Sequence, residues 1–168
     1  MHADFRYSGS LPNFGSHAFD LFRWVAGEVE WVQALPLDGG EPAVLAAAER
    51  GSTATFVQVR NPAADVFDAM FHAGESRFTI TCLGEELVRA APQPSRLFPG
   101  YVSLPAGDAG TEKGLEDAML NAVNELVEHV ESDAPLSCQG RDGVAALEIE
   151  AAVERSLASG TRSSPAPA

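Results

Sequence analysis

The chain has 168 residues, of which 45% are hydrophobic, and this suits a single globular domain rather than a disordered chain. Its 24 acidic and 11 basic residues give a formal net charge of −13, which disfavours nucleic acids and anionic membrane surfaces as partners. Lys113 is the only lysine, so lysine-based catalysis is nearly excluded.

The cysteines and the hydropathy pattern bear on the cellular compartment. Cys82 and Cys138 form no CxxC motif, which indicates free thiols in a reducing environment. No apolar run approaches the ~18 residues of a membrane span. The stretch from Met1 to Tyr7 lacks the apolar core of a signal peptide. We therefore expect a cytoplasmic protein.

The first predicted element is a helix over residues 14–26. Apolar residues recur there at helical spacing from Phe14 to Val25. Asn13 stands where an N-cap belongs, and Gly27 stands where a C-terminal glycine belongs.

A series of short strands is predicted next, because β-rich runs alternate with tight turns. The runs cover residues 29–35, 43–49, 52–60, 66–72, 77–82 and 86–90. This regular spacing predicts an antiparallel meander.

The last third of the chain is predicted to be a loop followed by two helices. Residues 91–111 are rich in Pro and Gly and indicate a long loop. An apolar stripe from Leu115 to Val130 predicts a helix, and a second helix is expected from Asp142 to about Ala158. We expect the tail, residues 161–168, to be disordered.

The order of these elements predicts an α+β fold. Strands and helices are segregated, which favours an open antiparallel sheet of about five to six strands with helices packed on one face. The other face of the sheet needs a cover, and a second copy of the chain or another domain would provide one.

Asn13, His17 and Asp20 are the first candidates for a functional site. Their separations of four and three residues place them on one face of a helix. Histidine can move a proton near neutral pH, and an amide one turn earlier can hold a substrate hydroxyl. The same spacing also fits a structural interpretation, in which Asn13 is an ordinary cap and His17 is partly buried beside Asp20.

Other candidate groups are weaker. His72 at a strand end suits a structural role, and His129 suits a solvated helix face. A metal site made from His17, Asp20 and another carboxylate is open, but the spacing specifies none.

The stretch from Gly9 to Glu28 carries a family resemblance. The residues that carry it are Asn13-Phe14-Gly15-Ser16-His17, then Asp20, then an apolar helix that ends in Trp24-Val25-Ala26-Gly27. They resemble a signature of the glucose–fructose oxidoreductase/inositol dehydrogenase/rhizopine-catabolism (Gfo/Idh/MocA) family. The stretch from Cys138 to Ile149 resembles the family's closing helix entry. The resemblance covers about residues 5–160, so we assign residues 1–160 to a C-terminal domain of this family that is short at its N-terminus.

The resemblance implies roles for the three candidates. The family's histidine, matched by His17, assists proton transfer at the substrate carbon that gives or takes hydride. Asn13 occupies a position where many members have Asp. Because an amide is not a base, Asn13 would only bind or orient the substrate. Asp20 would give structural support. In this family the free sheet face commonly makes the subunit contact.

The family's other half, a Rossmann domain, has no match in this sequence. No GxGxxG motif occurs, and Lys113 lies in Gly-Thr-Glu-Lys-Gly rather than in the family's Glu-Lys-Pro motif. The motif begins nine residues from Met1, so we also expect the first strand of the C-terminal half to be missing. NAD or NADP would then bind only through a separate Rossmann domain.

These observations predict the substrate-binding and oligomerisation half of an NAD(P)-dependent oxidoreductase. The substrate would be a sugar, cyclitol or nucleotide-sugar, and the chain alone would not transfer hydride. The expected partners are a second copy at the sheet face and a separate Rossmann-domain chain. Two alternatives stay open: a non-catalytic sugar-binding or dimerisation module, and a cofactor-independent epimerase or lyase that uses His17.

Overall fold

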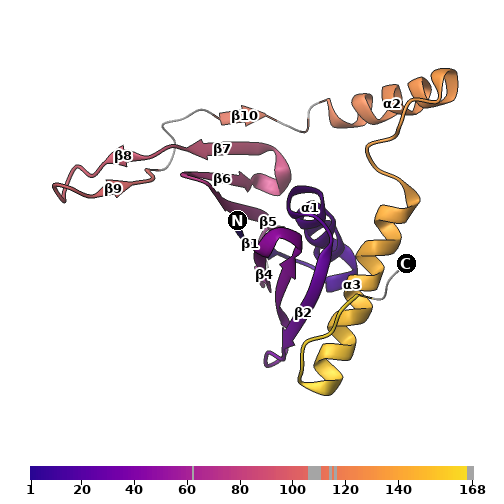
Figure 1. Ribbon diagram of the computed structural model, residues 1–168, viewed down its shortest axis with the longest axis horizontal. Coiled ribbons are helices and arrows are strands. Elements are labelled where there is room, and N and C mark those ends of the chain that lie inside the picture. The colour runs from indigo at the N-terminus through magenta and orange to yellow at the C-terminus, as the bar shows by residue number, and fades with distance from the viewer. Residues whose placement is uncertain (62, 106–110, 114, 116, 166–168) are drawn as a thin grey trace.

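A single large sheet forms the centre of the molecule (Figure 1). The computed structural model describes residues 1–61, 63–105, 111–113, 115 and 117–165. The strand order is β10-β7-β6-β5-β1-β4-β3-β2, and every neighbouring pair is antiparallel except β1 with β4. The strands are β1 (His2–Tyr7), β2 (Val29–Leu35), β3 (Ala43–Ala48), β4 (Ser52–Gln58), β5 (Phe67–Ala73), β6 (Ser76–Thr81), β7 (Glu86–Ala90) and β10 (Thr111–Lys113). The predicted open, mostly antiparallel sheet is confirmed, with more strands than the expected five to six.

Strand β1 lies in the middle of this sheet, so the expectation that the first strand is missing is wrong. It pairs with β4 on one side and with β5 on the other. Ala3, Phe5 and Tyr7 are buried, whereas Arg6 between them is exposed. This alternation is the pattern of a strand with one buried face. Because β1 separates β4 from β5, the sheet is not a simple meander.

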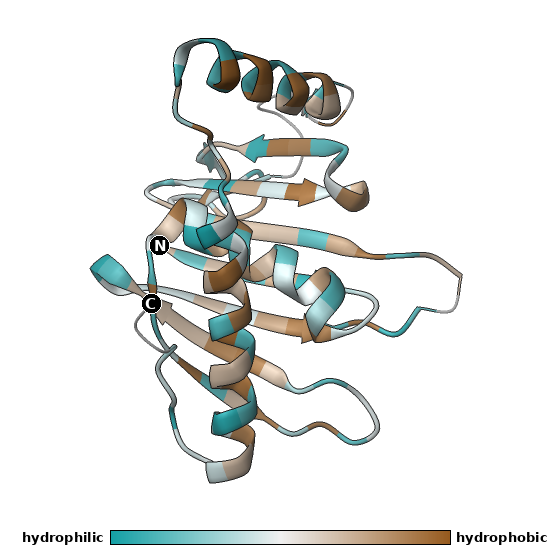
Figure 2. Ribbon diagram, turned by 90° about the vertical axis from the view of Figure 1, so that its right-hand side faces the viewer, coloured by the Kyte–Doolittle hydropathy of each residue, from teal (hydrophilic) through white to brown (hydrophobic). Residues whose placement is uncertain are grey.

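Two helices cover one face of the sheet. A π-helical turn (Leu11–Gly15) leads into α1 (Ser16–Ala26), and α3 (Gly140–Ser159) packs beside α1. Figure 2 shows α1 and α3 in front of the strands. The predicted cap at Asn13 is wrong, because the helical segment begins three residues earlier, after Ser10. Gly27 does end α1, with φ of 91° and its N–H donating to the carbonyl of Arg23.

An aromatic cluster fixes α1 to the sheet. The ring of Phe5 on β1 stacks on that of Phe56 on β4, with centroids 4.8 Å apart. Phe19 and Phe22 of α1 meet the Phe56 ring edge-on at 4.7 and 5.9 Å. All four side chains are almost fully buried. Such pairs contribute about 0.5–1.5 kcal/mol each beyond the burial of their area, so the cluster sets the position of α1.

The segment between β7 and the last two helices departs most from the predictions. Part of the expected loop forms a projecting hairpin of β8 (Gln93–Pro94) and β9 (Val102–Ser103), and another part forms β10. Residues 106–110 of that loop lie outside the described residues. Helix α2 (Ala118–Ser132) follows and stands away from the sheet (Figure 1).

The C-terminal tail is ordered where the structure describes it. Ser163 and Val32 of β2 exchange both backbone hydrogen bonds, at 2.8 and 2.9 Å. The guanidinium of Arg162 lies 3.9 Å from the centroid of the Trp31 ring. The expectation of disorder is therefore wrong for residues 161–165, whereas residues 166–168 lie outside the described range. Within that range no helix is both long and apolar enough to span a membrane.

None of the described helices covers the sheet face opposite α1 and α3. We call it the open face. Its middle strands carry His2, Asp4 and Arg6 on β1 beside Thr55 on β4 and Met70 on β5. These side chains are half-buried or exposed, in contrast to the fully buried opposite face.

Candidate functional site

The carboxyl ends of β1 and β4 meet at one edge, because these two strands are parallel. The loop after β1 is held there by several hydrogen bonds. The N–H of Ser8 donates to the carbonyl of Val66 at 2.8 Å, and the Ser8 hydroxyl accepts from the N–H of Val66 at 2.9 Å. The Gln58 amide donates to the carbonyl of Gly9. The loop that leads into the π turn is therefore fixed.

The π turn places Asn13 and His17 on the surface. Such turns are rare and occur often at functional sites. Both side chains are exposed, and His17 makes no hydrogen bond with any described residue. The structural alternative of a partly buried His17 beside Asp20 is therefore not what the structure has. An exposed amide and imidazole one turn apart can contact one small polar ligand.

Asp20 is bound to Arg23 rather than to His17. Its carboxylate accepts from Nη1 of Arg23 at 3.2 Å. Arg23 also holds Glu28 in two hydrogen bonds of 2.9 and 2.7 Å and lies 3.6 Å from the carboxylate of Asp142. The Arg23 side chain is only 9% exposed. Asp20 thus belongs to an ion-pair cluster that joins α1 to the start of α3.

The pKa values in this cluster follow from the pairing. The hydrogen bonds from Arg23 lower the pKa of Glu28 and raise that of Arg23 itself. The pKa of Asp142 is lowered first by the backbone N–H of Gln139 and then by Arg23. These shifts favour the charged forms of Arg23, Glu28 and Asp142, so these three groups suit a structural ion-pair role rather than proton transfer.

A cleft of about 300 Å³ adjoins the Asp20 end of this helix face. Its lining residues are Asp20, Arg23, Trp24, Glu28, Ser137, Cys138 and Asp142. Three carboxylates outnumber the one guanidinium, so the lining favours uncharged polyhydroxy ligands over anions. Trp24 stands at its edge and is 78% exposed. The sequence analysis did not select Trp24 as a site residue, although it lies one turn beyond Asp20.

Two buried polar atoms lie beneath the π turn. The hydroxyl of Tyr7 and Oε1 of Glu150 on α3 are buried and have no hydrogen-bond partner among the described residues. Burial raises the pKa of both groups. A carboxylate without a partner in the core destabilises the folded chain when it is ionised.

We expect Glu150→Met to stabilise the chain at pH 8 by about 1 kcal/mol, the low end of the cost of an unpaired buried polar group. The pKa of Glu150 is higher in the folded than in the unfolded chain, so folding takes up a proton between these two values. Stability therefore falls as the pH rises through that window, and the gain should shrink toward pH 4. Urea titrations at several pH values measure this, with the half-exposed Glu148→Met on the same helix as control. An equal gain at every pH would contradict the assignment to charge.

Comparison with solved structures finds the same fold in several enzymes. A levoglucosan dehydrogenase in complex with NADH and levoglucosan matches 100% of this chain and 59% of its own, with a TM-score of 0.76 and 15% identity. A putative NADPH-dependent oxidoreductase from Desulfitobacterium hafniense matches 97% of this chain and 56% of its own, with a TM-score of 0.74 and 14% identity. The WlbA dehydrogenase from Bordetella pertussis, in complex with NADH and UDP-GlcNAcA, matches 99% of this chain and 55% of its own, with a TM-score of 0.65 and 14% identity. No family model and no curated protein sequence matches the chain.

The chain has the fold of these oxidoreductases. It spans less than two thirds of the length of each one. The neighbours are of the Gfo/Idh/MocA type that the sequence resembles, so the recognition of that fold is confirmed. The partial coverage is consistent with the C-terminal domain of such an enzyme.

The oxidoreductase fold of this chain offers no dinucleotide cradle at the turn between β1 and α1. A Cβ on Gly15 would lie 3.3 Å from Leu11 and 3.4 Å from the Tyr7 ring, and one on Gly9 would lie 3.1 Å from Phe14. Both glycines thus serve packing inside the chain rather than contact with a phosphate. This turn therefore does not suit the phosphates of NAD(P). The described residues also contain no group of three His, Cys, Asp or Glu side chains placed to hold a metal.

The remaining candidates lie apart from the π turn. His72 is on β5, on the open face beside His2 of β1. Nδ1 of His129 lies 2.6 Å from the carbonyl oxygen of Ala134, which suits a structural role at the end of α2. Cys82 and Cys138 are both exposed free thiols, as predicted.

Proposed function

We propose that this chain is the substrate-binding and oligomerisation half of an NAD(P)-dependent oxidoreductase that acts on a sugar, cyclitol or nucleotide-sugar. The observation that carries the proposal is the coverage: the whole chain matches, but little more than half of each neighbour is matched. In this proposal Asn13 orients a substrate hydroxyl, and His17 takes up or gives its proton. Asp20 supports their helix through Arg23.

In this proposal a Rossmann domain outside residues 1–168 supplies the cofactor site. Two exposed apolar features of the chain are proposed to contact such a domain. Trp24 projects from the candidate helix face, and one stripe of α2 is exposed along its length. The exposed residues of that stripe are Met119, Leu120, Val123, Leu126, Val127 and Val130. An apolar stripe of this size on a helix without a packing partner is typical of a docking surface.

The open face is proposed to bind a second copy of the chain. The chain as a whole carries a charge of −13. The strands β1, β5, β6 and β7 nevertheless place three carboxylates and two guanidinium groups on this face: Asp4, Asp68, Glu86, Arg6 and Arg77. This near balance lets two copies meet there without burying a concentration of like charge.

A fluorescence titration of the purified chain with NADH and NADPH tests the proposal. We expect no quenching of Trp24 or Trp31, because the turn between β1 and α1 does not suit a dinucleotide phosphate. Addition of a separate Rossmann-domain chain should restore binding, and the exposed Trp24 should then be quenched more than Trp31, which Arg162 covers. Binding by the isolated chain at micromolar concentration would overturn the half-enzyme proposal.

A non-catalytic sugar-binding or dimerisation module is the second candidate. It is supported by the same coverage. Calorimetric titration with neutral sugars and cyclitols separates the two. Binding without turnover, even when a Rossmann-domain chain is present, would favour the module.

A further inference from the structure

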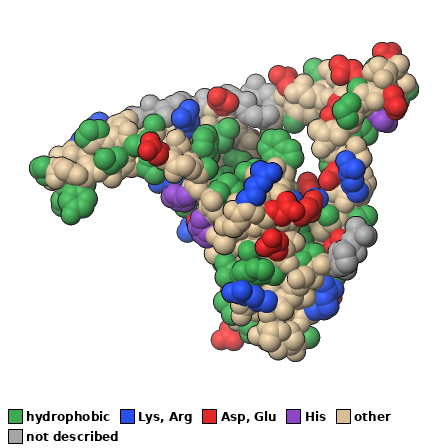
Figure 3. Space-filling view, in the orientation of Figure 1, with side chains coloured by type: hydrophobic (Ala, Val, Ile, Leu, Met, Phe, Trp, Pro, Cys, Tyr) green, Lys and Arg blue, Asp and Glu red, His purple; other side chains and the backbone are tan. Residues whose placement is uncertain are grey.

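The hairpin of β8 and β9, residues 93–104, projects from the sheet as an arm (Figure 1). Four apolar side chains near its tip are strongly exposed: Leu97 at 82%, Phe98 at 62%, Tyr101 at 72% and Val102 at 69%. Figure 3 shows hydrophobic side chains gathered at this end of the molecule. An apolar group of this kind on a projecting segment marks an interaction site.

The arm is ordered by its own hydrogen bonds. The N–H of Ser95 donates to the carbonyl of Tyr101 at 2.8 Å, and the Ser95 hydroxyl accepts from the N–H of Phe98 at 3.1 Å. The rings of Phe98 and Tyr101 meet edge-on, with centroids 6.3 Å apart. Because the aromatic pair is held in place, binding through it would cost little conformational entropy.

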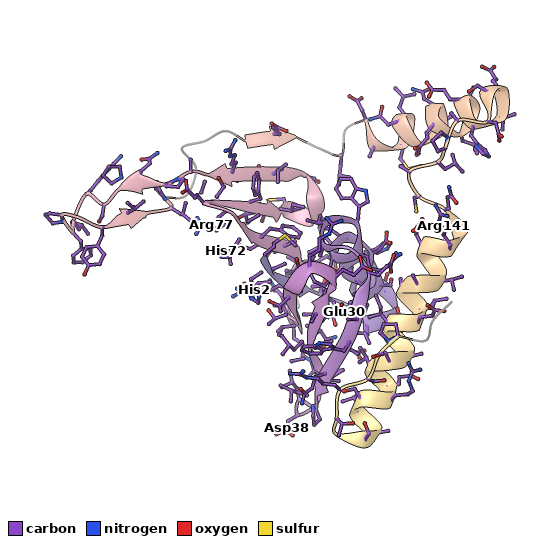
Figure 4. All side chains as sticks on the ribbon, in the orientation of Figure 1. His2, Glu30, Asp38, His72, Arg77 and Arg141 are labelled. Carbon is purple, nitrogen blue, oxygen red and sulfur yellow. The ribbon has the colours of Figure 1, made fainter. Side chains whose placement is uncertain are left out.

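The arm points to the side of the sheet that α1 and α3 leave open (Figures 1 and 2). His2, His72 and Arg77 lie on that side in Figure 4. Arg77 joins the open face to the arm, because its guanidinium donates to the carbonyl of Leu104 at 3.3 Å. A molecule seated on the open face would therefore lie within reach of the arm.

Charge favours a second copy as that molecule. Arg96 is the only charged residue of the arm, which thus carries +1 in a chain of net charge −13. The arm of one copy is therefore attracted to the acidic body of another. A two-fold axis would let both copies contribute an arm, so each contact is made twice.

We infer that the arm of each copy packs against a second copy docked on the open face and holds the pair together. This inference rests on the self-association proposed above. It adds a contact that the sheet faces alone do not make.

The dissociation constant of the pair, measured by sedimentation equilibrium, tests the inference. We expect the double variant Phe98→Ser, Tyr101→Ser to raise the dissociation constant of the pair at least ~10-fold, since buried aromatic side chains contribute most of the binding energy of interfaces. Both residues are exposed in the single chain, so its melting temperature should not change. Leu147→Ser, at a similarly exposed position on α3 on the opposite side of the sheet, is the matched control and should leave the dissociation constant unchanged.

A photoreactive p-benzoylphenylalanine in place of Leu97 tests the contact directly. We expect a cross-linked pair, whose second site mass spectrometry should place on another copy of the chain. A pair that the double variant does not weaken and that Leu97 does not cross-link would overturn the arm contact alone. In that case Met70→Lys on the open face should still dissociate the pair. A wild-type chain that stays monomeric at every concentration would overturn the proposed self-association as well.

Discussion

His17→Ala is expected to lower the turnover of the chain combined with the proposed cofactor domain by about 10²–10⁴-fold, the usual contribution of a general acid or base. The imidazole is exposed and makes no hydrogen bond with any residue that the structure describes. Its loss should therefore leave the free energy of unfolding unchanged within ~0.5 kcal/mol. Steady-state kinetics together with urea unfolding of the same samples separate the two effects.

Asn13→Ala is the matched comparison, because Asn13 lies one turn before His17 and is equally exposed. An amide binds a substrate hydroxyl but does not accept its proton. We therefore expect a raised KM with a much smaller change in kcat. If His17→Ala turned over normally, His17 would not be the proton-transfer group. A change in KM alone would make it a binding residue.

The parts of the fold that were predicted correctly are those with a strong local pattern. The apolar spacing of α1 and the glycine after it are such a case, and so are the alternating Phe78 and Ile80 of β6. Strand β1 carried an equally clear signal in the alternation of Ala3, Phe5 and Tyr7. No strand was predicted there, although the alternation fits one.

Features that depend on contacts between distant residues could not be predicted from local patterns. The parallel pairing of β1 with β4 inserts a strand between two runs that look adjacent in sequence. The described part of the tail is held by long-range contacts such as that of Ser163 with Val32, more than a hundred residues away. The π turn likewise moved the N-cap from the predicted Asn13 to Ser10, whose side chain makes no capping hydrogen bond.

The candidate site was predicted in part. The sequence placed Asn13 and His17 on one helix face, and both are exposed there. It left open whether Asp20 supports His17 or the helix, and the structure pairs it with Arg23. The cleft beside Asp20 includes Ser137 and Cys138, which precede α3. No periodicity relates residues so far apart, so only the three-dimensional fold brings them together.

Arg23→Met is expected to lower the free energy of unfolding by about 2 kcal/mol, measured by urea titration at pH 7. Removing one partner of a buried ion pair costs about 3–5 kcal/mol, but here water reaches the carboxylates of Glu28 and Asp20, which lowers the cost. Methionine keeps most of the buried aliphatic stem, so the loss reports mainly on the ion pairs. Arg141→Met, an exposed arginine at the start of α3, is the matched control and should change stability by less than ~0.5 kcal/mol.

The pH dependence of this loss gives a second test. Arg23 lowers the pKa of Glu28 in the folded chain. At a pH between the folded and the unfolded pKa, Glu28 is protonated only in the unfolded chain, so folding releases a proton there. The stability that Arg23 provides is thus complete above the unfolded pKa of Glu28 and is lost as the pH drops through the folded value. The difference between wild type and Arg23→Met should therefore shrink in acid. A difference that stays constant from pH 7 to pH 3 would mean that Arg23 stabilises α1 and α3 by packing rather than by charge.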